Sequence, residues 1–202
     1  MKLYIILICL MFFSSCNQKQ GKLPFLGNPI ITETDTIYPT IADFILTNQD
    51  GKTITNETFR DKIYVADFIF LSCPTICPKM TKEMYNVYLS YATDARVGFI
   101  SHTIDPEHDT IRRLKSYAEN LGVSSAKWQF VTGNQDSILS LSEHSYFSAA
   151  YPDSTSPGGF THSGGLLLVD MHRHIRGVYN STNPSETKRL INDIKTLLKE
   201  QF

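Results

Sequence analysis

Hydrophobic and polar positions change their period several times between residue 30 and the end of the chain. Residues 62–70, KIYVADFIF, form a continuous run of β-branched and aromatic side chains. Such a run is typical of a central strand buried on both faces. Residues 79–92 instead place apolar side chains at helical spacing, and Pro78 just before them suits the first turn of a helix. The pattern therefore predicts a buried strand followed, after a short loop, by a helix.

The same alternation continues to the C-terminus. Strands are predicted at 95–105 and 127–133, and two more at 163–180 around a turn near 171–173. Helices are predicted at 108–122, 134–146 and 183–200, each preceded by a residue suited to an N-cap. These caps are Asp109 or Thr110, Asn134 and Asn183, and Gly122 suits the end of the first of the three helices. Residues 147–162, rich in Pro, Gly and Ser, are predicted to form a long loop.

The part of the chain before residue 62 predicts a hairpin and a tether. In residues 41–62, apolar positions lead into Asn48-Gln49-Asp50-Gly51, a turn signal, so a β-hairpin is expected. Residues 17–39 are polar and interrupted by Pro and Gly, as in a tether. Within them, apolar and polar residues alternate at 30–38 well enough to predict one strand. The order of elements predicts an α/β sandwich with a mixed sheet. It resembles a thioredoxin-like fold with an extra N-terminal β-hairpin.

The N-terminus predicts export and a membrane anchor. Lys2 is followed by an apolar run to Phe13, too short to span a bilayer comfortably, and then by Ser14-Ser15-Cys16. This segment resembles a bacterial lipoprotein signal, which implies cleavage of residues 1–15 and lipidation of Cys16. Residues 16–37 would then be a lipidated tether and residues 38–202 the folded domain. An uncleaved signal anchor with an incidental cysteine is the alternative, and both place the domain outside the cytoplasm.

The net charge and the cysteine content of the chain limit the classes of function that it can have. The 202-residue chain has a formal net charge of −1, so nothing in its bulk electrostatics suggests nucleic-acid binding. Cys9 would leave with the signal peptide and Cys16 would carry lipid. Of the four cysteines, Cys73 and Cys77 are then the two thiols of the folded domain. Extracytoplasmic compartments are oxidising, so these two could form a disulfide.

The two sulfurs are expected at one edge of the sheet. Cys73 follows a central strand and Cys77 opens the next helix, in the crevice where open α/β sheets bind ligands. Side chains four positions apart on a helix lie on the same face, so the two sulfurs can point to one place. A helix N-terminus lowers the pKa of a cysteine, so both sulfurs are expected to be accessible and prone to ionise. Two soft thiolates suit Cu(I) or Zn(II).

A third ligand would make such a site selective, and the chain offers six histidines. His162 closes the long predicted loop, from which a side chain could reach a neighbouring strand end, although a histidine bonded to the backbone is the alternative. His102 lies in or at the end of a strand and could approach the same crevice. Surface, packed or solvated roles fit the others, which are His108, His144, His172 and His174.

Three segments together resemble the Sco/SenC family, the copper chaperones of cytochrome c oxidase assembly. They are FIFLSCPTICPKM, TIDPEHDT and THSGGLLLVDMHRHIRGVYN, and the resemblance runs from about residue 38 to the C-terminus. It implies a thioredoxin-like fold and copper ligands at Cys73, Cys77 and His162. Many members have an acidic residue directly before the ligand histidine, where this chain has Thr161. Asp105 could orient a ligand or take up a proton near the site, or it could merely shape the turn into the helix.

Two function classes stay open. The first is a copper-binding module that delivers copper to the dinuclear site of cytochrome c oxidase or another copper protein, or that keeps the cysteines of that site reduced. Cu(I) tolerates three ligands, whereas Zn(II) normally takes a fourth, and an added oxygen could complete a site for Cu(II). The second is a thiol-disulfide oxidoreductase or thiol peroxidase with Cys73 or Cys77 as nucleophile. A structural disulfide is less favoured, because so short a loop constrains the unfolded chain only modestly.

Overall fold

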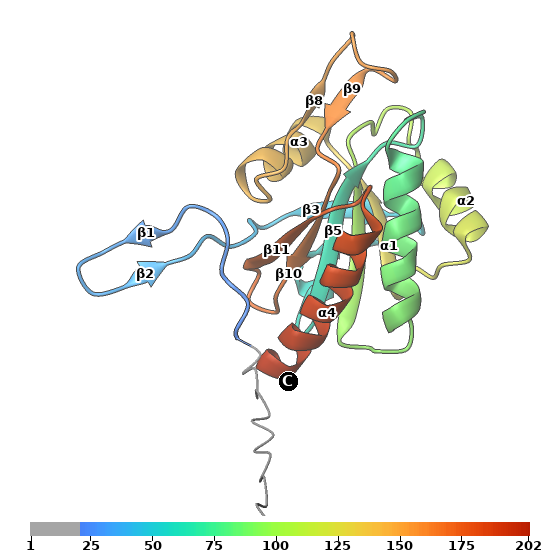
Figure 1. Ribbon diagram of the computed structural model, residues 1–202. Coiled ribbons are helices and arrows are strands. Elements are labelled where there is room, and N and C mark those ends of the chain that lie inside the picture. Colours follow the sequence, from blue (N-terminus) through green and yellow to red (C-terminus); the bar gives the residue numbers. More distant parts are fainter. Residues whose placement is uncertain (1–20) are drawn as a thin grey trace, which may run out of the picture.

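A seven-stranded mixed sheet forms the centre of the computed structural model, which describes residues 21–202 (Figure 1). The strands lie in the order β11-β10-β5-β6-β7-β3-β4. Strands β5, β6 and β7 are parallel to one another, and the other neighbours pair antiparallel. Their bounds are β3 (Ile45–Asn48), β4 (Thr53–Thr55), β5 (Ile63–Ile69), β6 (Val97–Thr103), β7 (Trp128–Thr132), β10 (Gly165–Val169) and β11 (Ile175–Asn180).

Within the described residues, four α-helices cover the two faces of this sheet: α1 (Cys77–Tyr91), α2 (Ile111–Leu121), α3 (Gln135–His144) and α4 (Pro184–Gln201). Helices α1, α2 and α4 lie together on one face, and α3 lies on the other (Figure 1). A 3-10 turn, η1 (Asn56–Phe59), follows β4. The mixed sheet flanked by helices is the thioredoxin-like arrangement that the order of elements predicts, and β3 and β4 form the expected hairpin.

The predicted helix caps are confirmed for three of the four helices. The side chains of Thr110, Asn134 and Asn183 accept hydrogen bonds from backbone N–H groups in the first turns of α2, α3 and α4. Gly122 ends α2 in the left-handed region, with φ of 69°. Helix α1 differs, because its N-cap residue, Ile76, provides no side-chain hydrogen bond. The first backbone N–H groups of α1 are therefore left for other partners.

The core is centred on two parallel strands. Every residue of β5 and of β6 is buried, which confirms the prediction from the continuous apolar run at 62–70. Side chains alternate between the faces of a strand. Tyr64 and Phe68 therefore point to the α3 side, where both pack with Tyr146, and Asp67 points to the face covered by α1. A carboxylate at the centre of an otherwise apolar strand is unusual, since buried charges are costly unless they are paired.

Two segments that are predicted as a single strand and as a loop each form a short hairpin in the structure. Residues 30–38 form two strands, β1 (Ile30–Ile31) and β2 (Thr36–Ile37), that pair antiparallel and project from the body (Figure 1). The predicted loop at 147–162 contains β8 (Ala150–Pro152) and β9 (Phe160–His162), which also pair antiparallel. Gly158 and Gly159, both with positive φ, lie in the turn between them. Each strand has only two or three residues, which is too short for a clear sequence period.

The segment before the first hairpin packs against the body through one buried arginine. Arg176 is 2% exposed and lies between Asp170, at 3.0 Å, and Glu200, at 2.7 Å. Its guanidinium also donates to the backbone oxygens of Leu23 and Pro24 and stacks over the Phe25 ring. Contacts with the body therefore begin at Leu23, well before residue 38.

The predicted signal peptide and Cys16 lie outside the described residues, and none of the helices within residues 21–202 has the length and apolar character of a membrane span.

We expect Arg176→Ala to destabilise the fold strongly, because it leaves the buried Asp170 carboxylate without its cation. Breaking a buried ion pair from one side typically costs about 3–5 kcal/mol. Urea unfolding monitored by circular dichroism measures the change. The matched control is Arg60→Ala, which removes a largely exposed pair with Glu57 and should change stability far less. Equal losses in the two variants would show that the buried network adds nothing beyond a surface pair.

Candidate metal centre

Cys73 and Cys77 occupy the junction between β5 and α1. Cys73 lies in the loop after β5, where its N–H donates to the Phe70 oxygen, and Cys77 is the first residue of α1. The buried carboxylate of Asp109, in the turn after β6, holds the start of this loop. It accepts hydrogen bonds from the Leu71 N–H at 3.0 Å and from the Thr103 hydroxyl at 2.6 Å. The cysteines are thus held at the carboxyl edge of the parallel strands, where the sequence places them.

His162 reaches the same place from a different element. It is the last residue of β9 and pairs with Ala150 across the β8–β9 hairpin. The next residue, Ser163, fixes the base of the hairpin through its N–H to the Ala149 oxygen and through a 2.6 Å contact with the Ser148 hydroxyl. The His162 ring packs edge-on against Phe70, with centroids 5.6 Å apart.

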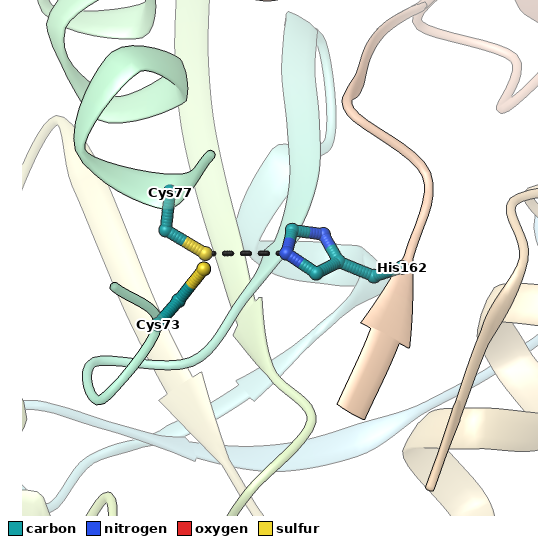
Figure 2. Close-up of side chains that lie close together, drawn as sticks. All are labelled: Cys73, Cys77 and His162. Carbon is teal, nitrogen blue, oxygen red and sulfur yellow. Dashed lines mark hydrogen bonds between the residues drawn. The ribbon is translucent and has the colours of Figure 1, made fainter. Parts of the chain in front are cut away.

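The three side chains converge on one point. Figure 2 shows both sulfurs and the imidazole facing one another, and the Cys77 Sγ lies 3.2 Å from the His162 Nε2. One atom from each of the three residues lies within 4.8 Å of the others. Within residues 21–202, no other group of histidines, cysteines and carboxylates gathers three such atoms. Both cysteines are free thiols in the structure. The arrangement is therefore a preformed set of two sulfurs and one nitrogen.

The two thiols have opposite protonation tendencies. Burial raises the pKa of Cys73, but hydrogen bonds from the backbone of Cys77 and Thr75 outweigh it and lower the pKa overall. The uncapped N-terminus of α1 thus stabilises one thiolate. Burial raises the pKa of Cys77, and the neighbouring Cys73 adds to the rise. The expectation that both sulfurs are accessible and prone to ionise is wrong, since Cys73 and Cys77 are 7% and 5% exposed and Cys77 keeps its proton.

Burial also keeps the His162 ring neutral by lowering its pKa. A neutral imidazole offers a lone pair, and it does so here beside one thiolate-prone sulfur and one protonated sulfur. Such a set can bind a soft cation, with loss of the Cys77 proton. It can also form a disulfide if the two sulfurs are oxidised, which would remove two of the three donors at once. Metal binding and disulfide formation therefore exclude each other, because both use the same two sulfur atoms.

Asp67 lies below the start of α1 and was not singled out from the sequence. It is 1% exposed, and neither carboxylate oxygen has a hydrogen-bond partner in the structure. Burial raises its pKa to about 7. When ionised, Asp67 opposes ionisation of Cys77. The only sequence signal was one acid within the apolar run at 62–70.

The other candidate residues lie elsewhere. His102 is fully buried in β6, stacked on Phe68, and burial lowers its pKa to about 4, so it acts as a neutral core residue. Asp105 pairs with the His108 ring at 2.9 Å and accepts no hydrogen bond from the three converging side chains. His144 is a surface residue beside Glu143. His172 and His174 lie in the turn between β10 and β11, where the Asp170 carboxylate accepts from the N–H groups of both.

Asp109, rather than Asp105, is the acid that supports the cysteine loop. From the sequence it was one of two candidate N-caps for α2. In the structure, Thr110 is the cap, and the buried Asp109 carboxylate bonds to the loop before Cys73. A candidate cap for the next helix carries no signal of a contact with a loop 38 residues away in the chain.

The fold and the site define a thioredoxin-like protein with a two-thiol, one-imidazole centre, and known proteins share the fold. The family model SCO1/SenC matches residues 32–199. Because this match covers most of the chain, the chain belongs to the SCO1/SenC family.

Three solved structures are similar to this chain. A SCO1/SenC family lipoprotein from Bacillus anthracis has 27% identity and a TM-score of 0.72, over 79% of this chain and 95% of that one. BsSco, described as a member of the Sco family of cytochrome c oxidase assembly proteins with a disulfide switch, has 27% identity and a TM-score of 0.70, over 88% and 98%. Bradyrhizobium japonicum ScoI with copper bound has 25% identity and a TM-score of 0.65, over 78% and 99%.

Substituting Asp67 should change how stability depends on pH. The folded-state pKa of about 7 lies above the ordinary aspartate value of 3.8, so the unfolded chain loses this proton first. The contribution of Asp67 to stability should therefore fall as pH rises from about 4 to about 7, by up to about 4 kcal/mol for a shift of three pKa units. Asp67→Asn removes this dependence. Its stability relative to the native chain should rise between pH 5 and pH 8 in urea unfolding of the reduced, metal-free protein.

Asp94→Asn is the control for this experiment. Hydrogen bonds from Arg96 lower the pKa of Asp94 to about 2, so this carboxylate is ionised in both states above pH 5. The Asp94 variant should differ from the native chain by the same amount at pH 5 and pH 8. A constant difference for Asp67→Asn as well would mean that Asp67 ionises normally in the folded protein.

Proposed function

We propose that this protein is an extracytoplasmic copper-binding protein that serves the copper site of cytochrome c oxidase. It would hold copper through Cys73, Cys77 and His162. It would then either deliver the metal to the dinuclear copper site of the oxidase or keep the cysteines of that site reduced. The observation that carries this proposal is the convergence of these three donors, from a loop, a helix and a separate hairpin, within 4.8 Å.

The donor set favours copper over other soft metals. Two sulfurs and one imidazole satisfy Cu(I), whereas zinc normally takes four ligands. Asp105 and Asp109, which follow the neighbouring strand β6, are otherwise engaged, Asp105 with His108 and Asp109 with Leu71 and Thr103. The copper-bound relative from Bradyrhizobium supports the same assignment. The chemistry that bound copper would supply is metal transfer between soft ligands, and the protein contributes the sulfurs, the imidazole and burial from solvent.

A lipid anchor at Cys16 would keep this activity at the membrane. The Ser14-Ser15-Cys16 sequence after a short apolar run supports it, and so does the lipoprotein described among the similar structures. The target would then be a membrane protein whose copper-containing domain lies on the same side. The link of BsSco to oxidase assembly supports the copper-containing oxidase subunit as that target.

Thiol-disulfide exchange is the second candidate, and the lowered pKa of Cys73 favours it. The Cys73 thiolate, in the loop before α1, could attack a disulfide of the target, and Cys77 could then resolve the mixed disulfide. This reaction uses both sulfurs but has no evident use for the imidazole. His162 therefore distinguishes the two candidates.

Anaerobic Cu(I) binding to the reduced full chain in detergent tests the proposal. We expect one tightly held copper per chain. The Cys73→Ser/Cys77→Ser variant should lose it, and His162→Ala should bind at least about tenfold more weakly, which corresponds to about 1.4 kcal/mol. His144→Ala, which removes an exposed histidine on α3, is the matched control and should bind as the native chain does.

Competition with a chromophoric Cu(I) chelator gives the affinities. If the native chain holds no copper, or if His162→Ala binds as tightly as the native chain, the three-donor site is wrong. Thiol-disulfide exchange would then be the better description of the pair.

A further inference from the structure

The hairpin that carries His162 has little backbone support of its own. Strands β8 and β9 pair with each other alone, through three registered residue pairs, and they join neither edge of the main sheet. The hairpin stands above the carboxyl edge of that sheet (Figure 1). Isolated two-stranded hairpins are marginal in water. Side chains must therefore hold His162 in register with the cysteines.

One carboxylate organises the far end of this hairpin. Asp153 follows β8 directly, and its two oxygens accept four hydrogen bonds. The donors are the Thr155 N–H at 3.0 Å, the Thr155 hydroxyl at 2.6 Å, the Ser156 hydroxyl at 2.6 Å and the Thr161 hydroxyl at 2.8 Å. The first three close the turn locally. The fourth crosses from the end of β8 to β9.

The cross-strand bond acts on the residue next to the histidine. Thr161 and His162 are consecutive in β9, so their side chains leave opposite faces of the hairpin. Asp153 therefore does not touch the imidazole. By fixing Thr161 it restrains the backbone from which His162 projects, while Ser163 restrains the other side through Ala149 and Ser148. The imidazole is thus held between two anchored neighbours.

We propose that Asp153 is a positioning residue of the metal centre, which acts through the Thr161 hydroxyl to hold His162 against Cys73 and Cys77. The inference rests on the proposed role of His162 as a ligand. It also gives Thr161 a function: the hydroxyl connects the ligand-bearing strand to a carboxylate on the opposite strand.

The Asp153 carboxylate stays ionised throughout the neutral range. Hydrogen bonds from Ser156, Thr155 and Thr161 hold its pKa well below the usual range. Bonds to an ionised acceptor are about twice as strong as neutral ones. Solvent nevertheless reaches this turn, so the loss of one bond should loosen the hairpin without unfolding the domain. The expected consequence is a several-fold effect on metal affinity rather than loss of binding.

Two substitutions at Thr161 separate positioning from mere turn formation. Thr161→Val removes the hydroxyl and keeps the shape, whereas Thr161→Ser keeps the hydroxyl. In anaerobic Cu(I) competition on the full chain in detergent, Thr161→Val should bind about threefold to tenfold more weakly, and Thr161→Ser should bind nearly as the native chain does. Asp153→Asn should weaken binding at least as much as Thr161→Val, because it also weakens the three bonds that close the turn. The double variant should be no weaker than Asp153→Asn alone, because that substitution already weakens the cross-strand bond.

The same variants in a His162→Ala background show whether the effect passes through the imidazole. There, Thr161→Val should cause no further loss of affinity. In the metal-free protein, the His162 ring resonances should broaden in Thr161→Val and stay sharp in Thr161→Ser. Ser125→Ala, which removes an exposed hydroxyl bond to Asp50 outside the metal centre, should leave Cu(I) affinity unchanged.

Each contrary result has a distinct meaning. If Thr161→Ser is as weak as Thr161→Val, or if Thr161→Val is equally harmful without His162, the positioning role is wrong. If His162→Ala weakens binding but Thr161→Val does not, this inference fails while the three-donor site stands. If His162→Ala itself has no effect, the proposed ligand set fails and the positioning role fails with it.

Discussion

The junction between strand β5 and helix α1 is the constraint on which the site depends. The strand is buried along its whole length, so its end cannot shift without disturbing the core. The helix starts without a side-chain cap, and its free N–H groups face the Cys73 sulfur. One short loop between them therefore fixes the spacing of two sulfurs and sets their unequal acidities. Asp109, bonded to Leu71 from the turn after β6, stiffens the same junction.

The two cysteines and the histidine are held in place by different kinds of contact. The cysteines belong to the core, and their loop is secured by buried groups. His162 belongs to a two-stranded hairpin attached through the Ser148–Ser163 contact and the packing of Phe160 and His162 on Phe70. Two of the donors are therefore held by the core, and the third depends on the contacts of the hairpin.

The interior near the site contains polar groups that reduce stability. Asp67 has no hydrogen-bond partner, and the His102 Nε2 is buried without one. Each such group costs free energy on folding. The surrounding core, with β5 and β6 buried along their full length, offsets this cost. Unpaired buried groups in native proteins often accompany function, and Asp67, which opposes ionisation of Cys77, lies where it can influence the thiol chemistry.

The sequence by itself determined the order of the major elements, three helix caps, and the place of Cys73 and Cys77 between a buried strand and a helix, because apolar periodicity and cap chemistry are local. The position of His162 in the predicted loop made it a candidate ligand, and the resemblance in three motifs favoured it. Tertiary structure decided what local pattern cannot encode: that His162 lies on a hairpin, that Asp109 and not Asp105 supports the cysteine loop, and that His102 is a core residue. It also decided that Cys77 keeps its proton, since burial depends on residues far apart in the chain.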